Sequence, residues 1–232
     1  MDFLNTPRSF KYPEAIAHRR LMLNEPHVAP LTAYVESLRA KHPTWEFQDF
    51  DPADGGVEAE MLFLFEKPGP MTSSTGKQQG SGFISRNNDD PTAEATFSFM
   101  AETNIDRKRT VIWNIISGWN GTIKVSSAEC RDGLDELKNL VSLLPRLQTV
   151  VLVGRKAGNA EALMRSLGLR VFTSAHPSPK VRSINRPMWD LIPKQWAEAA
   201  KPDYSDSGAI RSTTPESGSG SFVTHQTPAE GI

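Results

Sequence analysis

Residues 61–65 read Met-Leu-Phe-Leu-Phe, and this apolar run is the first of four similar segments. The others are residues 110–115, 149–153 and 169–174, which are also rich in branched or aromatic side chains. Strands that are apolar on both faces belong in parallel sheets that are covered on both sides. The pattern therefore predicts four parallel strands in one sheet.

Helical patterns alternate with these strands. Apolar side chains recur at helical spacing in residues 94–102, 128–144 and 158–167, and further helices are expected at residues 30–41 and 187–200. Alternation of strands and helices is typical of βαβ units. We expect an α/β fold, a three-layer α/β/α sandwich around a four-stranded parallel sheet.

The chain has 232 residues, enough for one ordinary domain with some length left over. We predict a single α/β domain over residues 1–201. Residues 202–232 are rich in Ser, Gly, Thr and Pro, so we expect a disordered tail there. Residues 69–92 are mostly polar and predict a long loop, a feature that is usually functional or disordered in compact domains.

The composition limits the class of protein. No apolar run approaches the roughly 20 residues that cross a bilayer, and no secretory leader is visible, so a soluble, cytoplasmic monomer without membrane contact is expected. Cys130 is the only cysteine and cannot form an internal disulfide or supply a metal site alone, so no metal or cofactor is predicted. The net charge of −1 means that any nucleic-acid surface must be a local basic cluster.

Unusual sequences follow each predicted strand, where parallel α/β sheets bind their ligands. They are Glu-Lys-Pro-Gly-Pro at residues 66–70, a segment that begins with Asn114, Gly-Arg-Lys-Ala-Gly at residues 154–158, and His-Pro-Ser-Pro at residues 176–179. We expect the strands that precede Asn114 and His176 to be adjacent, so that one pocket holds both side chains.

These motifs resemble those of the uracil-DNA glycosylase superfamily. Glu-Lys-Pro-Gly at residues 66–69 resembles the Gly-Glu-Ala-Pro-Gly motif of the bacterial and archaeal enzymes, and residues 176–179 look like the second motif. Residues 80–86 are similar to the segment whose Phe stacks on the flipped base, and Asn114 lies where the family has its base-reading Asn. The resemblance covers residues 61–189. The family's iron-sulfur branch uses four cysteines, which this chain lacks.

Two residues carry the implied chemistry of the base. Two prolines follow His176 and restrict the local backbone. The resemblance implies that His176 donates to uracil O2 and stabilises the charge on the leaving base. Asn114 presents an acceptor and a donor that match uracil N3–H and O4, whereas cytosine presents the reverse pattern. The alternatives are a loop histidine bonded to backbone and an asparagine that caps a strand or turn.

Three further residues are predicted to contact the base. Phe83 lies in a polar loop, where an exposed aromatic ring is suited to stacking on a flipped base, or else anchors the loop to the core. Pro68 and Gly69 suit a turn where the backbone approaches DNA closely, although an ordinary turn has the same sequence.

Glu66 is implied to position the attacking water and to stabilise the oxocarbenium-like sugar. Lys67 departs from the family pattern, which has Ala there, or Asp or Asn in other branches. The lysine would pair with Glu66, contact phosphate or block the water, and each outcome bears on substrate choice and rate.

A basic cluster follows His176. Residues 176–194 contain Lys180, Arg182 and two further cations against one Asp, an excess of three positive charges (4 − 1). We predict that Lys180 and Arg182 contact the DNA backbone and that Ser178 holds a phosphate, although many basic runs are only solvated faces. Val181 is the one apolar wedge candidate that follows the second motif.

The combined interpretation is a monofunctional N-glycosylase that flips out uracil, or a related deaminated base, and removes it from DNA with water, as in base excision repair. One alternative is a catalytically weak DNA-binding relative, in which Lys67 displaces the water chemistry. A second is a nucleotide-binding α/β protein that uses residues 154–158 as a phosphate loop.

Overall fold

The computed structural model describes residues 3–69, 72 and 80–202. The chain divides into two compact units, Met1–Lys201 and Pro202–Ile232, and every helix and strand named below lies in the first. The predicted tail lies outside the described residues, apart from Pro202.

A parallel sheet forms the centre of the first unit. Its strands are β2 (Met61–Phe65), β4 (Thr110–Asn114), β5 (Thr149–Val153) and β6 (Arg170–Ser174), in the order β4-β2-β5-β6. The predicted parallel sheet is therefore confirmed, with the second and fourth strands one residue shorter than expected. Every residue of β2, β4 and β5 is buried, as their apolar sequences require, and the edge strand β6 is mostly half-buried.

The order of the strands corrects one expectation. β4 and β6 form the two edges of the sheet, so the strands that precede Asn114 and His176 are not adjacent. The sheet grows outward from β2, with β4 added on one side and β5 and β6 on the other. Register pairs Phe65 with Asn114 and Val153 with Ser174, which keeps the carboxyl ends of the strands level.

A second, two-stranded parallel sheet includes one strand from the part of the chain that was predicted as loop. It pairs β1 (Asp49–Phe50) with β3 (Phe83–Ile84). Residues 81 and 83–88 are buried, so this half of the predicted polar loop is interior structure. Two-residue strands are too short to show an alternating pattern, which explains why the sequence did not predict them.

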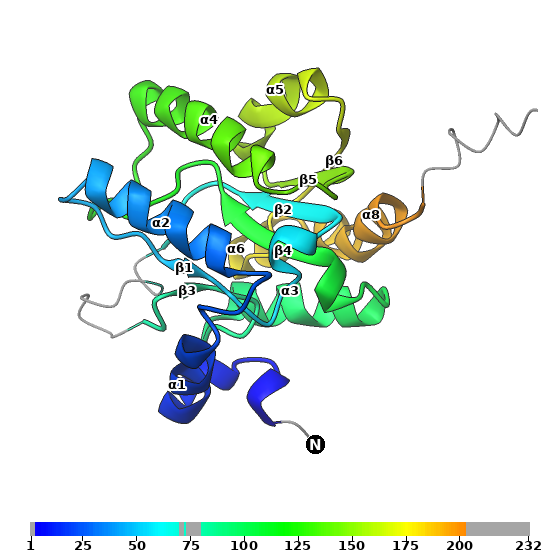
Figure 1. Cartoon of the computed structure of the whole chain (residues 1–232). Coiled ribbons are helices and arrows are strands. Elements are labelled where there is room, and N and C mark those ends of the chain that lie inside the picture. Colours follow the sequence, from blue (N-terminus) through cyan, green and yellow to red (C-terminus); the bar gives the residue numbers. More distant parts are fainter. Residues whose placement is uncertain (1–2, 70–71, 73–79, 203–232) are drawn as a thin grey trace, which may run out of the picture. The chain divides into compact units, whose positions relative to one another are not determined.

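Helices cover both faces of the larger sheet (Figure 1). α4 (Ser127–Ser142) and α5 (Glu161–Ser166) lie on one face, and α3 (Pro91–Glu102) and α8 (Ile192–Ala199) lie on the other. α8 packs on β5, β6 and α3, while α2 (Ala29–Lys41) packs on β1 and its Tyr34 Oη donates to Glu136 O of α4. This is the predicted three-layer α/β/α arrangement.

Several helix boundaries follow from local chemistry. α4 begins with a capping box between Ser126 and Glu129, and Asp90 caps α3 by accepting from two backbone amides. The helix predicted at residues 187–200 is wrong as one element, because it is broken into α7 (Arg186–Asp190) and α8. Pro193 lies in the first turn of α8, where a missing amide hydrogen is tolerated, and so favours a new helix start.

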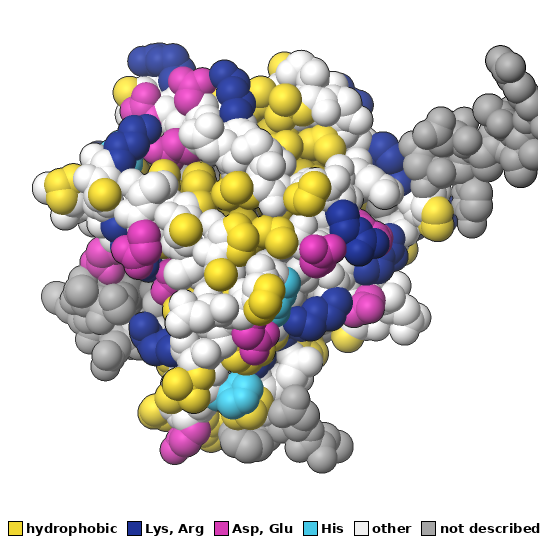
Figure 2. Space-filling view, viewed as in Figure 1, with side chains coloured by type: hydrophobic (Ala, Val, Ile, Leu, Met, Phe, Trp, Pro, Cys, Tyr) yellow, Lys and Arg dark blue, Asp and Glu magenta, His cyan; other side chains and the backbone are white. Residues whose placement is uncertain are grey.

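Other differences are smaller. The helix predicted at residues 158–167 begins as a 3₁₀ helix, Ala157–Ala160, and continues as α5. α1 (Pro13–Leu21) and α6 (Pro179–Ile184) were not predicted. No helix in the described ranges is long and apolar enough to cross a membrane. On the face drawn in Figure 2, acidic and basic side chains are interspersed, in keeping with the near-neutral net charge.

Candidate functional site

A cavity of about 390 Å³ lies at the carboxyl ends of β2 and β4. Four of the predicted site residues line it: Pro68, Gly69, Asn114 and His176. The other described lining residues are Phe65, Lys67, Thr72, Ile112, residues 84–86, 88 and 90, and the first turns of α3. This volume falls within the roughly 300 to 1,000 Å³ that is typical of small-molecule sites.

Asn114 ends β4 and projects into this cavity. Asn114 is 4% exposed, and its Nδ2 has no hydrogen-bond partner among the described residues. Buried amide groups are almost always bonded, because an unpaired donor loses its hydration without compensation. The fold therefore leaves this amide free to donate a hydrogen bond to a ligand in the cavity.

His176 reaches the same cavity although its strand lies at the other edge of the sheet. The chain turns after β6 and brings the imidazole edge-on to Phe65, with ring centroids 5.5 Å apart at 88°. Gly154, after β5, has a φ of +89°, and a Cβ there would lie 3.2 Å from His176 Cβ. The close approach and the left-handed backbone both favour glycine at this position.

Burial sets the charge of this imidazole. It lowers the pKa of His176 below its ordinary value, and the carboxylate of Glu66 acts in the opposite direction without cancelling the effect. The ring is therefore neutral near pH 7, with one N–H to donate. A neutral donor suits a task in which negative charge appears on the ligand only during the reaction.

Glu66 follows β2 but is not part of the cavity wall. Its Oε1 accepts a hydrogen bond from Lys156 Nζ, and the two side chains are 31% and 44% exposed. Lys156 belongs to the segment considered above as a phosphate loop. Its pairing with Glu66 ties that segment to the end of β2 and occupies one of the two cations of the segment.

Lys67 lines the cavity, and its ammonium group is engaged away from Glu66. Its Nζ donates to Glu129 Oε1 at 2.8 Å, to Asn120 Oδ1 at 2.7 Å and to the Lys124 carbonyl at 3.1 Å. The side chain is 4% exposed. Its ammonium group thus fastens residues 120–129 to the end of β2, and it neither pairs with Glu66 nor reaches toward solvent phosphate.

Phe83 does not line the cavity, and the prediction of an exposed stacking ring is wrong. The side chain is fully buried in a small cluster with Phe10, whose ring centroid lies 5.7 Å away, and the Arg20 guanidinium lies 5.7 Å from its ring. Phe83 therefore has the alternative role of anchoring its segment. Phe65 is the aromatic ring that the cavity wall contains.

Pro68 is buried, and Gly69 is half-exposed with no described atom within 4 Å of an added Cβ. The fold itself thus makes no steric demand for glycine at this position. Open space beside the backbone is what a close approach by a ligand or a DNA strand would use.

The residues predicted to contact phosphate lie on α6, outside the cavity. Ser178 caps this helix by accepting from Val181 N at 3.4 Å, while Lys180 and Arg182 are exposed. The Arg182 guanidinium lies 5.8 Å from the Trp189 ring. Val181 is partly buried against the core, so it is not a protruding wedge.

One member of the basic cluster is already paired. Arg186 Nε lies 2.8 Å from Asp190 Oδ1, both being exposed. The local excess of positive charge therefore rests on the remaining cations.

Sequence reasoning missed the polar wall of the cavity. Arg86, Asn88 and Asp90 line it, and they come from a run of six consecutive polar residues, 85–90, that the sequence suggested was solvated loop. One feature of the sequence indicated that this segment is buried: the apolar residue Ile84 directly precedes the polar run.

No protein-family profile and no curated protein sequence matches this chain. Several solved structures are similar to it, and three of them are described below. The first is the solution structure of a candidate uracil DNA glycosylase from Methanosarcina acetivorans, with 19% identity over 62% of this chain and 93% of that chain, and a TM-score of 0.41.

The second is the wild-type UNG of Nitratifractor salsuginis, with 12% identity over 80% of this chain and 98% of that chain, and a TM-score of 0.40. The third is the Y322F variant of mimivirus UNG in complex with UGI, with 13% identity over 78% of this chain and 73% of that chain, and a TM-score of 0.37.

Proposed function

We propose that this protein is a monofunctional DNA glycosylase that hydrolyses the N-glycosidic bond of uracil or a related deaminated base. The observation that carries the proposal is the unpaired, buried amide of Asn114 in the same cavity as a neutral His176. The two side chains come from opposite edges of the sheet and still face one space that is large enough for a flipped base.

Asn114 supplies recognition in this proposal. Its Nδ2 donates to O4 of the base and its carbonyl accepts from N3–H, which satisfies the amide that the protein leaves unpaired. Cytosine offers an amine and a bare ring nitrogen at those positions, so both groups would stay unpaired in a buried site. Discrimination of this kind is large because the wrong base strands buried polar groups.

His176 and Glu66 act on the two fragments that separate. When the bond between C1′ and the base nitrogen breaks, the electron pair stays on the base, and the His176 N–H donates to its O2 as the charge grows. Glu66, held by Lys156, orients the water whose oxygen adds to C1′ and accepts its proton. No lyase step or covalent lysine intermediate is needed.

A second candidate is a DNA-binding relative of low activity. It is favoured by the absence of Glu66 from the cavity wall and by its pairing with Lys156, which together hold the carboxylate at the rim. Lys67 does not decide between the candidates, because its ammonium group is engaged with Glu129.

The test is excision from labelled oligonucleotides that contain uracil, hypoxanthine, xanthine or mismatched thymine, followed by alkaline cleavage of abasic sites. We expect cleavage at uracil, and its loss in Asn114→Ala but not in Asn159→Ala, a matched change at an exposed asparagine outside the cavity. DNA binding without excision would select the second candidate. Absence of both would refute the proposal.

A further inference from the structure

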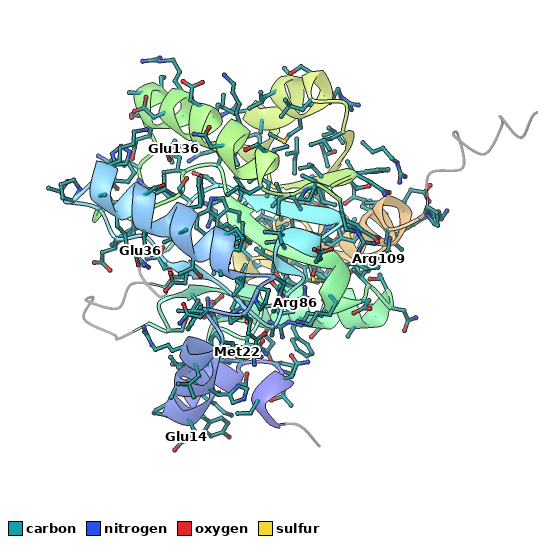
Figure 3. The ribbon with its side chains drawn as sticks, viewed as in Figure 1. Glu14, Met22, Glu36, Arg86, Arg109 and Glu136 are labelled. Carbon is teal, nitrogen blue, oxygen red and sulfur yellow. The ribbon has the colours of Figure 1, made fainter. Side chains whose placement is uncertain are left out.

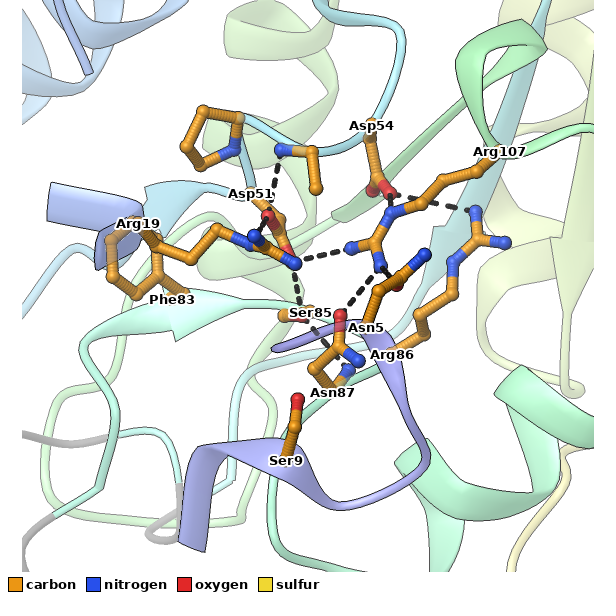
Figure 4. A network of polar contacts seen from close by, with 12 residues as sticks. Asn5, Ser9, Arg19, Asp51, Asp54, Phe83, Ser85, Arg86, Asn87 and Arg107 are labelled. Atoms are coloured by element: carbon orange, nitrogen blue, oxygen red, sulfur yellow. Dashed lines mark hydrogen bonds and ion pairs between the residues drawn. The ribbon is translucent and has the colours of Figure 1, made fainter. Parts of the chain in front are cut away.

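The cavity is bordered by a buried network of charged side chains (Figure 4). Asp51 and Asp54 are 2% and 1% exposed, and three guanidinium groups surround them: Arg19, Arg86 and Arg107. The carboxylates and guanidiniums sum to a charge of +1 (3 − 2). Burying a charge is costly unless it is paired, so the location of the excess charge is informative.

The excess charge rests on Arg86. Arg107 contacts Asp51 at 2.6 Å and Asp54 at 2.8 Å, and Arg19 contacts Asp51 at 2.9 Å. The nearest carboxylate contact of Arg86 is 3.5 Å, to the same Asp54 oxygen that Arg107 holds more closely. Arg86 also donates to Thr110 Oγ1, a neutral acceptor.

Arg86 is also the one guanidinium of this network that lines the cavity. It is 4% exposed, and its Nε has no hydrogen-bond partner among the described residues. Burial lowers the pKa of Arg86 to about 10, although the carboxylates of Asp54 and Asp51 oppose the effect, so the group remains a cation at neutral pH. Figure 3 labels Arg86 near the middle of the ribbon.

Asn88 and Asp90 of the same wall are hydrogen-bonded within the protein. Asn88 Oδ1 accepts from Ser81 Oγ at 2.6 Å and its Nδ2 donates to the Phe83 carbonyl at 3.0 Å. Asp90 Oδ1 accepts the amides of Thr92 and Ala93 at 2.9 and 3.0 Å, respectively. Among the fully buried side-chain atoms described in this wall, the two without a hydrogen-bond partner are both donors, namely Asn114 Nδ2 and Arg86 Nε.

We propose that Arg86 is a specificity-determining residue of the cavity, and that it selects heterocycles that present carbonyl oxygens and carry negative charge. The inference deepens the proposed function and rests on it in one respect: the anion is the base released when the glycosidic bond breaks. The electron pair from that bond spreads over the ring nitrogen and the carbonyl oxygens of the base. A buried cation with a free donor stabilises this charge, while His176 remains neutral.

The test uses free bases, so it does not depend on excision. Binding of barbiturate, uracil and cytosine is measured by ligand-observed NMR and calorimetry at neutral pH, where barbiturate is already an anion. We expect barbiturate to bind best and cytosine worst. In Arg86→Gln the preference for barbiturate over uracil should fall at least tenfold, which corresponds to about 1.4 kcal/mol.

Arg19→Gln is the matched control, because it removes a cation from the same network at a residue that does not line the cavity. It should retain the preference. If Arg86→Gln does not fold, Arg86→Lys is used instead, because lysine keeps the charge but lacks the planar guanidinium with its several donors. Its preference for barbiturate over uracil should be weaker than that of wild type but still measurable. An equal preference in wild type and a folded Arg86 variant, or no binding of barbiturate by wild type, would overturn the inference.

The two proposals fail in different ways. Binding that depends on Arg86 without uracil excision would support the assigned ligand class and reject the glycosylase reaction. Excision with no role for Arg86 in the base preference would reject this inference alone.

Discussion

The contact between Lys67, at the end of β2, and Glu129 can be tested by measuring the stability of variants in unfolding experiments. Its ammonium group donates to Glu129 at 2.8 Å, and Glu129 Oε2 also accepts the Ser126 amide at 2.6 Å. Burial alone would raise the pKa of Glu129, but the hydrogen bonds from Lys67 and Ser126 lower it from 4.5 to about 2. The carboxylate form is therefore stabilised by folding.

The size of the effect follows from this shift. A change from 4.5 to about 2 corresponds to about 3 kcal/mol at pH 7, at about 1.36 kcal/mol for each pKa unit. The Glu129 side chain is 14% exposed, so water screens part of its interaction with Lys67 and Ser126. We expect Glu129→Gln to destabilise the protein by about 1 to 2 kcal/mol at pH 7, and Lys67→Met by about 2 to 3 kcal/mol, because it leaves a carboxylate without its cation.

The sign of the pH dependence is fixed. Because the folded pKa of Glu129 is depressed, its stabilisation is complete above pH 4.5 and is lost as the pH falls through about 2. Urea unfolding of wild type and Glu129→Gln should therefore converge over that window. The double variant with Lys67→Met should be more stable than the sum of the single effects implies. A difference between wild type and Glu129→Gln that is constant from pH 7 to pH 2 would refute the reasoning.

Three further predictions follow from the placement of site residues. The lowered pKa of His176 means that the folded state resists protonation, so stability should fall as the pH drops below 6.5, and His176→Gln should lessen that fall in urea titrations. Phe83→Ala should lower the free energy of unfolding by about 3 to 5 kcal/mol, measured by thermal or urea unfolding, and should leave the affinity for a free base unchanged. Weakened base binding with unchanged stability would instead support a stacking role for Phe83. Lys180→Ala combined with Arg182→Ala should reduce the magnitude of the log-log salt slope of duplex binding by about 1.8, and an unchanged slope would remove both side chains from the interface.

The strands of the larger sheet were predictable because each is a short run that is apolar on both faces. Such runs are buried wherever they pair, so neither the partner nor the register needs to be known. Strand order was not predictable in the same way. We expected β4 and β6 to be neighbours so that one pocket could hold Asn114 and His176, but the chain adds strands on both sides of β2.

The candidate site was predictable where a residue directly follows a strand, as Asn114 does, because the strand end fixes its position. Side-chain partners that lie far away in sequence were not predictable. Lys67 pairs with Glu129, 62 residues further along the chain. Phe83 lies in a polar stretch of sequence, which suggested an exposed ring, but in the structure Phe10 packs against it. Arg86 lies in a polar run, which suggested that it was exposed to solvent, and the one carboxylate of the described residues that it contacts, Asp54, lies on another segment.

The central claim is that one cavity holds a base between Asn114 and His176, and single-turnover excision of uracil from a single-stranded oligonucleotide tests it most directly. The account predicts that His176→Ala slows the chemical step by roughly 10² to 10³ while DNA binding persists. It also predicts that Asn114→Asp loses uracil excision and gains a trace of cytosine excision, since a carboxylate repels O4 and accepts from an amine. Uracil excision at the wild-type rate in both variants would contradict the claim.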